Sequence, residues 1–328
     1  MMAGSKATVA VVRCSTYSPE AVRPAVARAF ELLGGPGRFI RPGQRVLIKP
    51  NLIVPIGPEV PAQTHPEVIC AVAEWVKEAG ARPVVGDSPA WGDVRACLAA
   101  LGAEERLRDM GVEIVQLDRP VRTKIDGTSV GISRAALEAD VILNLPKLKA
   151  HQQLGATFAF KNMYGCVAGK EKAFWHFAKG HSYESFCRML VGVYRQLAPA
   201  VNLIDGVVAM EGQGPISGTP RSLGCLIAGT DAAACERFCC RLIGFDPATL
   251  PILQTAAAMH AGCHEDEAID IVGDEWRSLV CMDFKPAVQT PLRFSFLRIC
   301  KSIAKQAMLL SPALFGKRRE RPTQRHAK

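Results

Sequence analysis

The stretch LNLPKLKAHQQLGATFAFKNMYG, residues 143–165, opens like a buried strand and then becomes rich in basic groups. No acidic residue lies within it. In a doubly wound α/β sheet, ligands bind beyond the carboxyl ends of the strands. The stretch therefore indicates a strand of such a sheet and a site at its end. The basic and amide side chains that it supplies are Lys147, Lys149, His151, Lys161 and Asn162.

Strand-like and helix-like segments alternate on both sides of this stretch. Short apolar runs typical of strands lie at 7–14, 44–51, 81–88, 141–147, 201–210, 224–231 and 269–276. Segments with helical signals lie at 18–35, 64–80, 94–111, 182–197, 232–243 and 250–262. This alternation predicts an α/β fold, in which a mainly parallel sheet carries helices on both faces.

Local signals predict where some of these elements begin and turn. Ser18 followed by Pro19 is a helix start, and Thr64 is expected to cap the next helix. Asp126 and Gly127 predict the turn of a hairpin within residues 123–133.

Polar residues follow several of the other predicted strands. Lysine has no special role in turns but binds phosphate or carboxylate, whereas Asp and Asn are common in turns for backbone reasons. The acids at the strand ends are therefore either site residues or ordinary turn residues. Lys149 and Lys161 either line the site or point into solvent. We expect a pocket for a small anion, lined by Lys49, Asn51, Ser88, Lys147, Lys149, Lys161, Asn162 and Asp205.

Three residues are candidates for catalysis. His151 stands among the lysines and is the preferred general acid or base, because histidine titrates near neutral pH. His65 lies at a predicted helix N-terminus, which favours anions and lowers the pKa of a histidine there. Its alternative is an exposed histidine in a first helical turn. Asp87 is expected to orient a base or to bind a cation.

Two further motifs are weaker. The loop MEGQGPISGTP, 210–220, suits a lid, a loop approaching phosphate or a plain surface loop, and it matches neither nucleotide-binding fingerprint. His260, Cys263 and His264 have a spacing that suits a metal, but no fourth ligand follows nearby. The sequence therefore predicts no metal site.

The charge of the chain is concentrated at its end. The 328 residues carry a net charge of +9, and residues 284–328 alone carry +10, which leaves −1 for residues 1–283. A nearly neutral body argues against nucleic-acid binding. We expect an α/β domain over 1–283 and a basic tail over 284–328. Within the tail, 292–328 predicts a basic amphipathic helix with a polybasic end, which either binds an anionic membrane surface or docks on the body.

The cysteines indicate a reducing compartment. Twelve are present, they are scattered, and no C-x-x-C occurs. No signal peptide is visible, and no apolar run is long enough to span a membrane. We therefore expect a cytoplasmic protein, peripheral at the inner membrane face if the tail binds lipid.

Seven motifs occur in order between residues 7 and 275: VLIKPNL, THPEV, VGDSP, LPKLKAH, FKNMYG, IDGVVAMEGQGP and GTDAAACERFCCRLIGFDP. Together they resemble the prokaryotic family catalogued as domain of unknown function 362. Many of its members carry a fused ferredoxin-type iron–sulfur module, so the resemblance implies oxidoreductase chemistry. This sequence has no C-x-x-C-x-x-C run and cannot form a cluster of that type. The cofactor therefore stays unknown, and a cluster would have to come from an electron-transfer partner.

The sequence favours an enzyme acting on a small carboxylate or phosphate, with iron–sulfur-linked redox chemistry implied by the resemblance alone. A non-catalytic anion carrier held at the membrane by the tail is the second interpretation. A metal-dependent isomerase or lyase is the third.

Overall fold

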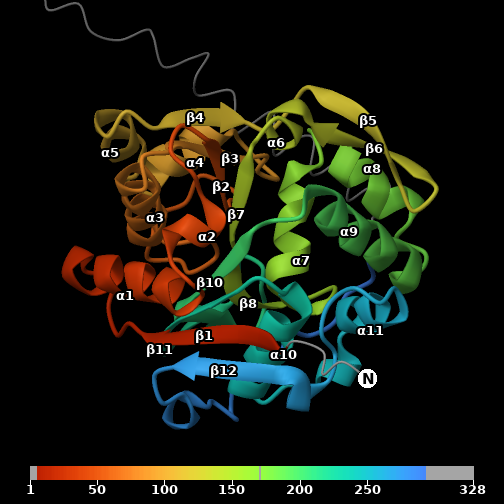
Figure 1. Ribbon diagram of the computed structural model, residues 1–328. Helices are drawn as coiled ribbons and strands as arrows, with labels where there is room; N and C mark the ends of the chain where they lie inside the picture. Colours follow the sequence, from red (N-terminus) through yellow and green to blue (C-terminus); the bar gives the residue numbers. More distant parts are fainter. Residues whose placement is uncertain (1–5, 170, 293–328) are drawn as a thin grey trace, which may run out of the picture.

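The computed structural model describes residues 6–169 and 171–292 (Figure 1). Its main sheet has ten strands, and the order along its principal path is β12-β1-β11-β10-β7-β2-β3-β4. The strands of this path are β1 Ala7–Arg13, β2 Arg45–Pro50, β3 Arg82–Asp87, β4 Glu113–Gln116, β7 Val141–Leu145, β10 Val201–Glu211, β11 Thr219–Gly229 and β12 Ile269–Gly273. Along the path only β11 pairs antiparallel with its neighbours, so the sheet is mainly parallel, as predicted.

Helices cover both faces of the sheet, which confirms the predicted fold class. On one face lie α1 Pro19–Leu32, α3 Pro66–Glu78, α4 Val94–Ala100 and α5 Glu104–Asp109. On the other lie α7 Ala159–Asn162, α9 Tyr183–Leu197, α10 Ala232–Ile243 and α11 Pro251–Ala258 (Figure 1). The alternation of strand side chains divides the core accordingly, because Val46 and Ile48 pack toward the first set and Leu47 toward the second. The short helix α6 Arg134–Leu137 contributes Ala136 to the core on the second face, and the short helix α2 Pro36–Phe39 packs Phe39 against the core on the first.

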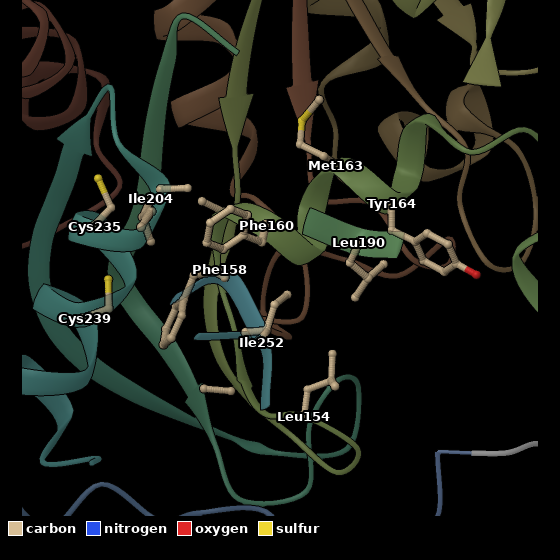
Figure 2. Close-up of a cluster of buried hydrophobic side chains, with 14 of the residues drawn as sticks. Leu154, Phe158, Phe160, Met163, Tyr164, Leu190, Ile204, Cys235, Cys239 and Ile252 are labelled. Carbon is tan, nitrogen blue, oxygen red and sulfur yellow. The ribbon is translucent and has the colours of Figure 1, made fainter. Parts of the chain in front are cut away.

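The core on the α7, α9, α10 and α11 side of the sheet supports the second half of the basic stretch. Figure 2 shows Phe158 and Phe160 close to Ile204, Ile252 and Cys239, all of them buried. These contacts hold the short helix α7 against the sheet. They therefore fix the position of the basic and amide residues that α7 carries.

Two predictions about element boundaries were wrong. His65, not Thr64, is the N-cap of α3, because the Thr64 hydroxyl donates to Leu145 O. The predicted helix over 94–111 is divided into α4 and α5, since Gly102 has a φ of 72° between them. The predicted hairpin is confirmed as β5 Pro120–Ile125 and β6 Thr128–Ser133, joined at Asp126-Gly127 in a separate sheet.

The strand predicted over 141–147 ends at Leu145, and Pro146 separates it from β8, Lys147–His151. Strand β8 pairs in parallel with β10 and antiparallel with β9, Gly155–Thr157. Of the predicted C-terminal segment, residues 284–292 pack on the body, where Phe284, Ala287 and Leu292 are buried. The predicted amphipathic helix beyond Leu292 lies outside the described residues. Within 6–169 and 171–292, no helix is long and apolar enough to cross a bilayer.

Candidate functional site

Strand β8 presents three basic side chains on one of its faces. Lys147, Lys149 and His151 alternate with Leu148 and Ala150, which belong to the core. Residues two apart on a strand are separated by about 6.7 Å, so the three basic residues form a row of about 13 Å. Their exposed fractions are 2%, 4% and 5%. The basic groups expected beyond the end of a strand therefore lie on a further strand, largely hidden from solvent.

Two of the predicted lysines form buried ion pairs with predicted acids. Lys49 Nζ lies 2.9 Å from Asp87 Oδ1, and Lys147 Nζ lies 2.9 Å from Asp205 Oδ2. None of the four side chains is more than 2% exposed. Gly165 leaves room for the first pair, because a Cβ at this position would lie 2.2 Å from Asp87 Oδ1. Lys49 and Lys147 therefore have their charge balanced within the protein.

Asp205 is the centre of a network that the sequence did not predict in full. It accepts hydrogen bonds from the Tyr17 hydroxyl at 2.7 Å and from His65 N at 2.9 Å, in addition to the Lys147 bond. Lys147 Nζ also donates to the Tyr17 hydroxyl at 2.7 Å, and the Tyr17 ring stacks on His65 with centroids 3.5 Å apart. Tyr17 was missed, although it follows a predicted strand as the other site residues do.

Lys149 has no such acidic partner. Its Nζ donates to Asn51 Oδ1 and to Ala62 O, the latter at 2.7 Å, and both acceptors are uncharged. Burial lowers the pKa of Lys149 well below its usual range, and the nearby Lys161 and Lys147 lower it further. The surroundings of Lys149 therefore favour its neutral amine, which is a base or nucleophile and not a counter-ion.

Lys161 and Lys172 complete the basic cluster. Both are partly buried, and burial lowers the pKa of each to about 8. Lys172 Nζ donates to Ser88 O, while Ser88 N donates to Asp87 Oδ1 at 2.6 Å. Within residues 6–169 and 171–292, neither Lys161 nor Lys172 forms an ion pair with a carboxylate, and the same holds for Lys149. The cluster of Lys149, Lys161 and Lys172 is called the unpaired lysine cluster below.

The two candidate histidines are neutral, and each accepts a backbone hydrogen bond at Nδ1. His151 Nδ1 accepts from Gln153 N at 3.1 Å, and His65 Nδ1 accepts from Glu67 N at 3.2 Å. Each ring therefore carries its proton on Nε2. Burial lowers the pKa of His65 to about 4 and holds the pKa of His151 well below its usual range. The lowered pKa expected for His65 is present, but burial is its largest cause.

The predicted Asn162 belongs to a chain of buried amides that crosses the sheet. Its Nδ2 donates to Lys49 O at 3.1 Å and to Asn144 Oδ1 at 2.7 Å. Asn144 Nδ2 in turn donates to Asn202 Oδ1 at 2.8 Å. Because these groups bond one another, Asn162 fixes the position of the Lys49 backbone.

Helix α8, Glu171–Ala178, brings two further residues that the sequence did not predict. It carries Lys172 and also His176, which is buried near His151. Glu171 anchors the start of the helix, because its Oε2 accepts from Gly131 N at 2.9 Å. Phe174 lies on the opposite side and is 54% exposed. A lysine and a histidine on the buried side of a short amphipathic helix are the signal that could have identified them.

The two weaker motifs differ in their contacts. The candidate metal-binding motif bonds its own loop, whereas the glycine-rich loop contacts the end of β8, where Gln152 N donates to Gly214 O at 3.3 Å. His264 Nε2 is 3.1 Å from Ala261 O, and Cys263 Sγ donates to Glu265 O, so both bond their own loop. In the described part of the chain, no group of three or more His, Cys, Asp and Glu residues is arranged to hold a metal. The glycine-rich loop joins β10 to β11, where Gln213 Oε1 accepts from Gln152 at 2.9 Å.

One curated protein and one solved structure resemble the chain. The thylakoid-associated protein sll1697 of Synechocystis sp. is 38% identical over 303 residues, which cover 91% of this chain and 94% of that protein. The lactate racemase apoprotein of Thermoanaerobacterium thermosaccharolyticum aligns with a TM-score of 0.45 and 12% identity. That alignment covers 73% of this chain but 57% of the racemase chain, and a likeness of this size carries no functional argument.

The family itself is established by a match to a family model that covers more than half of the chain. The model of the family described as domain of unknown function (DUF362) matches residues 46–241, which include both buried ion pairs and the unpaired lysine cluster. This match confirms the resemblance that the seven motifs indicated. The chain therefore belongs to the family of domain of unknown function 362.

Proposed function

We propose that the protein is an enzyme that binds a small carboxylate or phosphate at the unpaired lysine cluster. The observation that carries this proposal is the contrast among five neighbouring lysines. Lys49 and Lys147 have carboxylate partners, whereas the three lysines of the cluster have none in the described structure. The ammonium groups of Lys161 and Lys172 repel one another in this poorly solvated site, and a bound anion would relieve that repulsion.

The surroundings of each group support a division of roles. Lys161 and Lys172, with pKa values of about 8, are mainly protonated at pH 7 and would hold the anion. His151 would donate its Nε2 proton in a hydrogen bond to the same anion. Lys149, whose neutral amine is favoured, replaces His151 as the preferred base. Asp87 and Asp205 would act indirectly, because they hold Lys49 and Lys147 in place.

Titration calorimetry with sulfate tests the binding step. Lys161→Met and Lys172→Met each remove one charged donor, so each should weaken sulfate binding about tenfold or more. Lys124→Met is the matched control, since Lys124 is an exposed lysine on β5. The proposal fails if the two cluster variants bind sulfate as tightly as the control does.

The pH dependence of sulfate binding is a separate prediction. Sulfate keeps its charge between pH 6 and 10, so only the protein titrates. Because Lys161 and Lys172 must be protonated and have pKa values of about 8, the affinity should be constant below pH 7 and should fall above pH 8. The fall should be shallower in Lys161→Met. An affinity that rises between pH 8 and 9 would contradict the assigned roles.

The iron–sulfur-linked reaction implied by the family would require a separate electron-transfer protein. Native mass spectrometry of anaerobically purified protein tests for a bound cluster. The same measurement shows whether the protein binds the metal ion that a metal-dependent isomerase or lyase would need.

Attachment to an anionic membrane surface is the second candidate function. It is supported by the basic residues beyond Leu292 and by the relative whose name records thylakoid association. The full chain should float with vesicles that contain phosphatidylglycerol, and a chain ending at Leu292 should not. Vesicles of phosphatidylcholine alone are the control. Equal flotation of the two chains would exclude a membrane role for the tail.

A further inference from the structure

A cavity of about 200 Å³ lies beside the Lys147 end of the β8 row. Its walls are mostly apolar and include Val60, Pro61, Leu101 and Val208, with the stacked Tyr17 and His65 rings on one side. None of the residues proposed above to contact the anion lines this cavity. An apolar cavity of about 150 Å³ holds a benzene molecule, so this one has room for a single ring or a short branched chain.

The cavity is reachable from solvent. Pro58 and Glu59 line it and are exposed, so its mouth lies at the loop that precedes α3. Its deeper wall includes Lys147, which is 2% exposed. A ligand entering past Pro58 would therefore approach the β8 row from the Lys147 end.

The same loop connects the cavity to the unpaired lysine cluster. Pro61 and Gln63 line the cavity, and Ala62 between them accepts a hydrogen bond from Lys149 Nζ at 2.7 Å. Lys149 also follows Lys147 on the same face of β8, about 6.7 Å further along the strand. The cavity and the cluster are thus adjacent along one strand and share one covering loop.

We infer that this cavity is the subsite for an apolar group on the anion that the unpaired lysine cluster binds. The substrate class is accordingly an organic carboxylate or phosphate that carries a ring or a short hydrophobic chain next to its charged group. This inference rests on the proposed function and extends it, because the lysines alone would accept inorganic anions equally well.

Calorimetry with three phosphates of similar charge tests the subsite: inorganic phosphate, methyl phosphate and phenyl phosphate. Burial of a phenyl ring in an apolar cavity should make phenyl phosphate bind about tenfold or more tightly than methyl phosphate. Val60→Phe in the loop and Val208→Phe on β10 each fill the cavity from a different wall. Both should abolish this advantage while leaving inorganic phosphate binding within about twofold. Val288→Phe is the matched control, because Val288 is 69% exposed.

The outcomes separate this inference from the proposed function. Equal binding of methyl and phenyl phosphate by the unaltered protein would overturn the subsite and leave the anion site standing. Persistence of the phenyl advantage in both filled variants would overturn it as well. If no phosphate binds at all, the proposed function and the inference fail together.

Discussion

At the residue scale, the site is organised by charges that the fold has removed from water. Lys49 and Asp87 are 0% and 1% exposed, a location in which a single charge would be costly. Asp87 compensates by accepting from Leu52 N at 2.8 Å and Ser88 N at 2.6 Å as well as from the lysine. The pair is consequently a fixed part of the structure, against which the unpaired lysines are positioned.

Removing the acid of this pair should therefore destabilise the fold. Asp87→Asn leaves Lys49 as a buried, unpaired cation, and we expect a loss of about 3–5 kcal/mol in the free energy of unfolding, measured with urea. The double variant Lys49→Met/Asp87→Leu should recover most of this loss, because it buries no charge.

The control is the exposed pair Arg23–Glu74, in which the arginine side chain is 57% exposed. Glu74→Gln should change stability by less than about 1 kcal/mol. If Asp87→Asn proved no more costly than Glu74→Gln, the buried pair would not have the role described above.

At the element scale, helix α8 is anchored at its first residue by contacts with the β5–β6 hairpin. Its first residue, Glu171, bonds Gly131 N and lies 2.9 Å from Arg122 in an ion pair. Glu171→Ala should release this end of the helix, speed hydrogen exchange over 171–178 and weaken sulfate binding about fivefold, because Lys172 loses its position. Arg122→Met is the control, since it keeps the Gly131 bond. Unchanged exchange in Glu171→Ala would show that α8 is held by other contacts.

Elements fixed by neighbouring residues were predictable, and those fixed by distant pairing were not. The Asp126-Gly127 turn and the helix start at Pro19 depend on local backbone preferences, which the sequence displays directly. Strand β8 depends on pairing with β10, where Lys147 lies opposite Asp205, 58 residues away. The sequence therefore placed Lys147 and Asp205 in one predicted pocket, but it did not predict the extended strand.

Tyr17 and Lys172, which were not predicted, also depend on partners that are distant in the sequence. Tyr17 bonds Lys147 across 130 residues, and Lys172 bonds Ser88 across 84. Nothing in the residues near Tyr17 or Lys172 indicates these partners. By contrast, Lys147, Lys149 and His151 stand out in the sequence because they lie close together in one stretch that has no acidic residue.

At the scale of the whole molecule, the end of the described chain is bonded to the body close to the site. Thr290 N donates to Gln152 O at 2.7 Å, and Gln153 Nε2 donates to Pro291 O at 3.1 Å. Gln153 also bonds His151. The segment 284–292 therefore lies against the turn that follows β8.

Two truncations should differ in stability for this reason. The reference is a chain ending at Leu292, which keeps the packed segment 284–292. A chain ending at Asp283 loses the buried Phe284 and Leu292, which should cost about 3–6 kcal/mol and lower the melting temperature by about 5–10 °C. Circular dichroism melts measure both. Identical melts for the two truncated chains would mean that 284–292 contributes nothing to the body.

The place of β1 in the sheet has a consequence for synthesis on the ribosome. This strand emerges first, yet its two neighbours are β11 and β12, which begin at Thr219 and Ile269. At about 5–20 residues per second, β1 waits about 10–40 s for the first of them to be translated. Throughout that time both of its edges lack their native partners. Nascent chains stalled before Thr219 should consequently expose β1 to protease, whereas chains released after Gly273 should protect it.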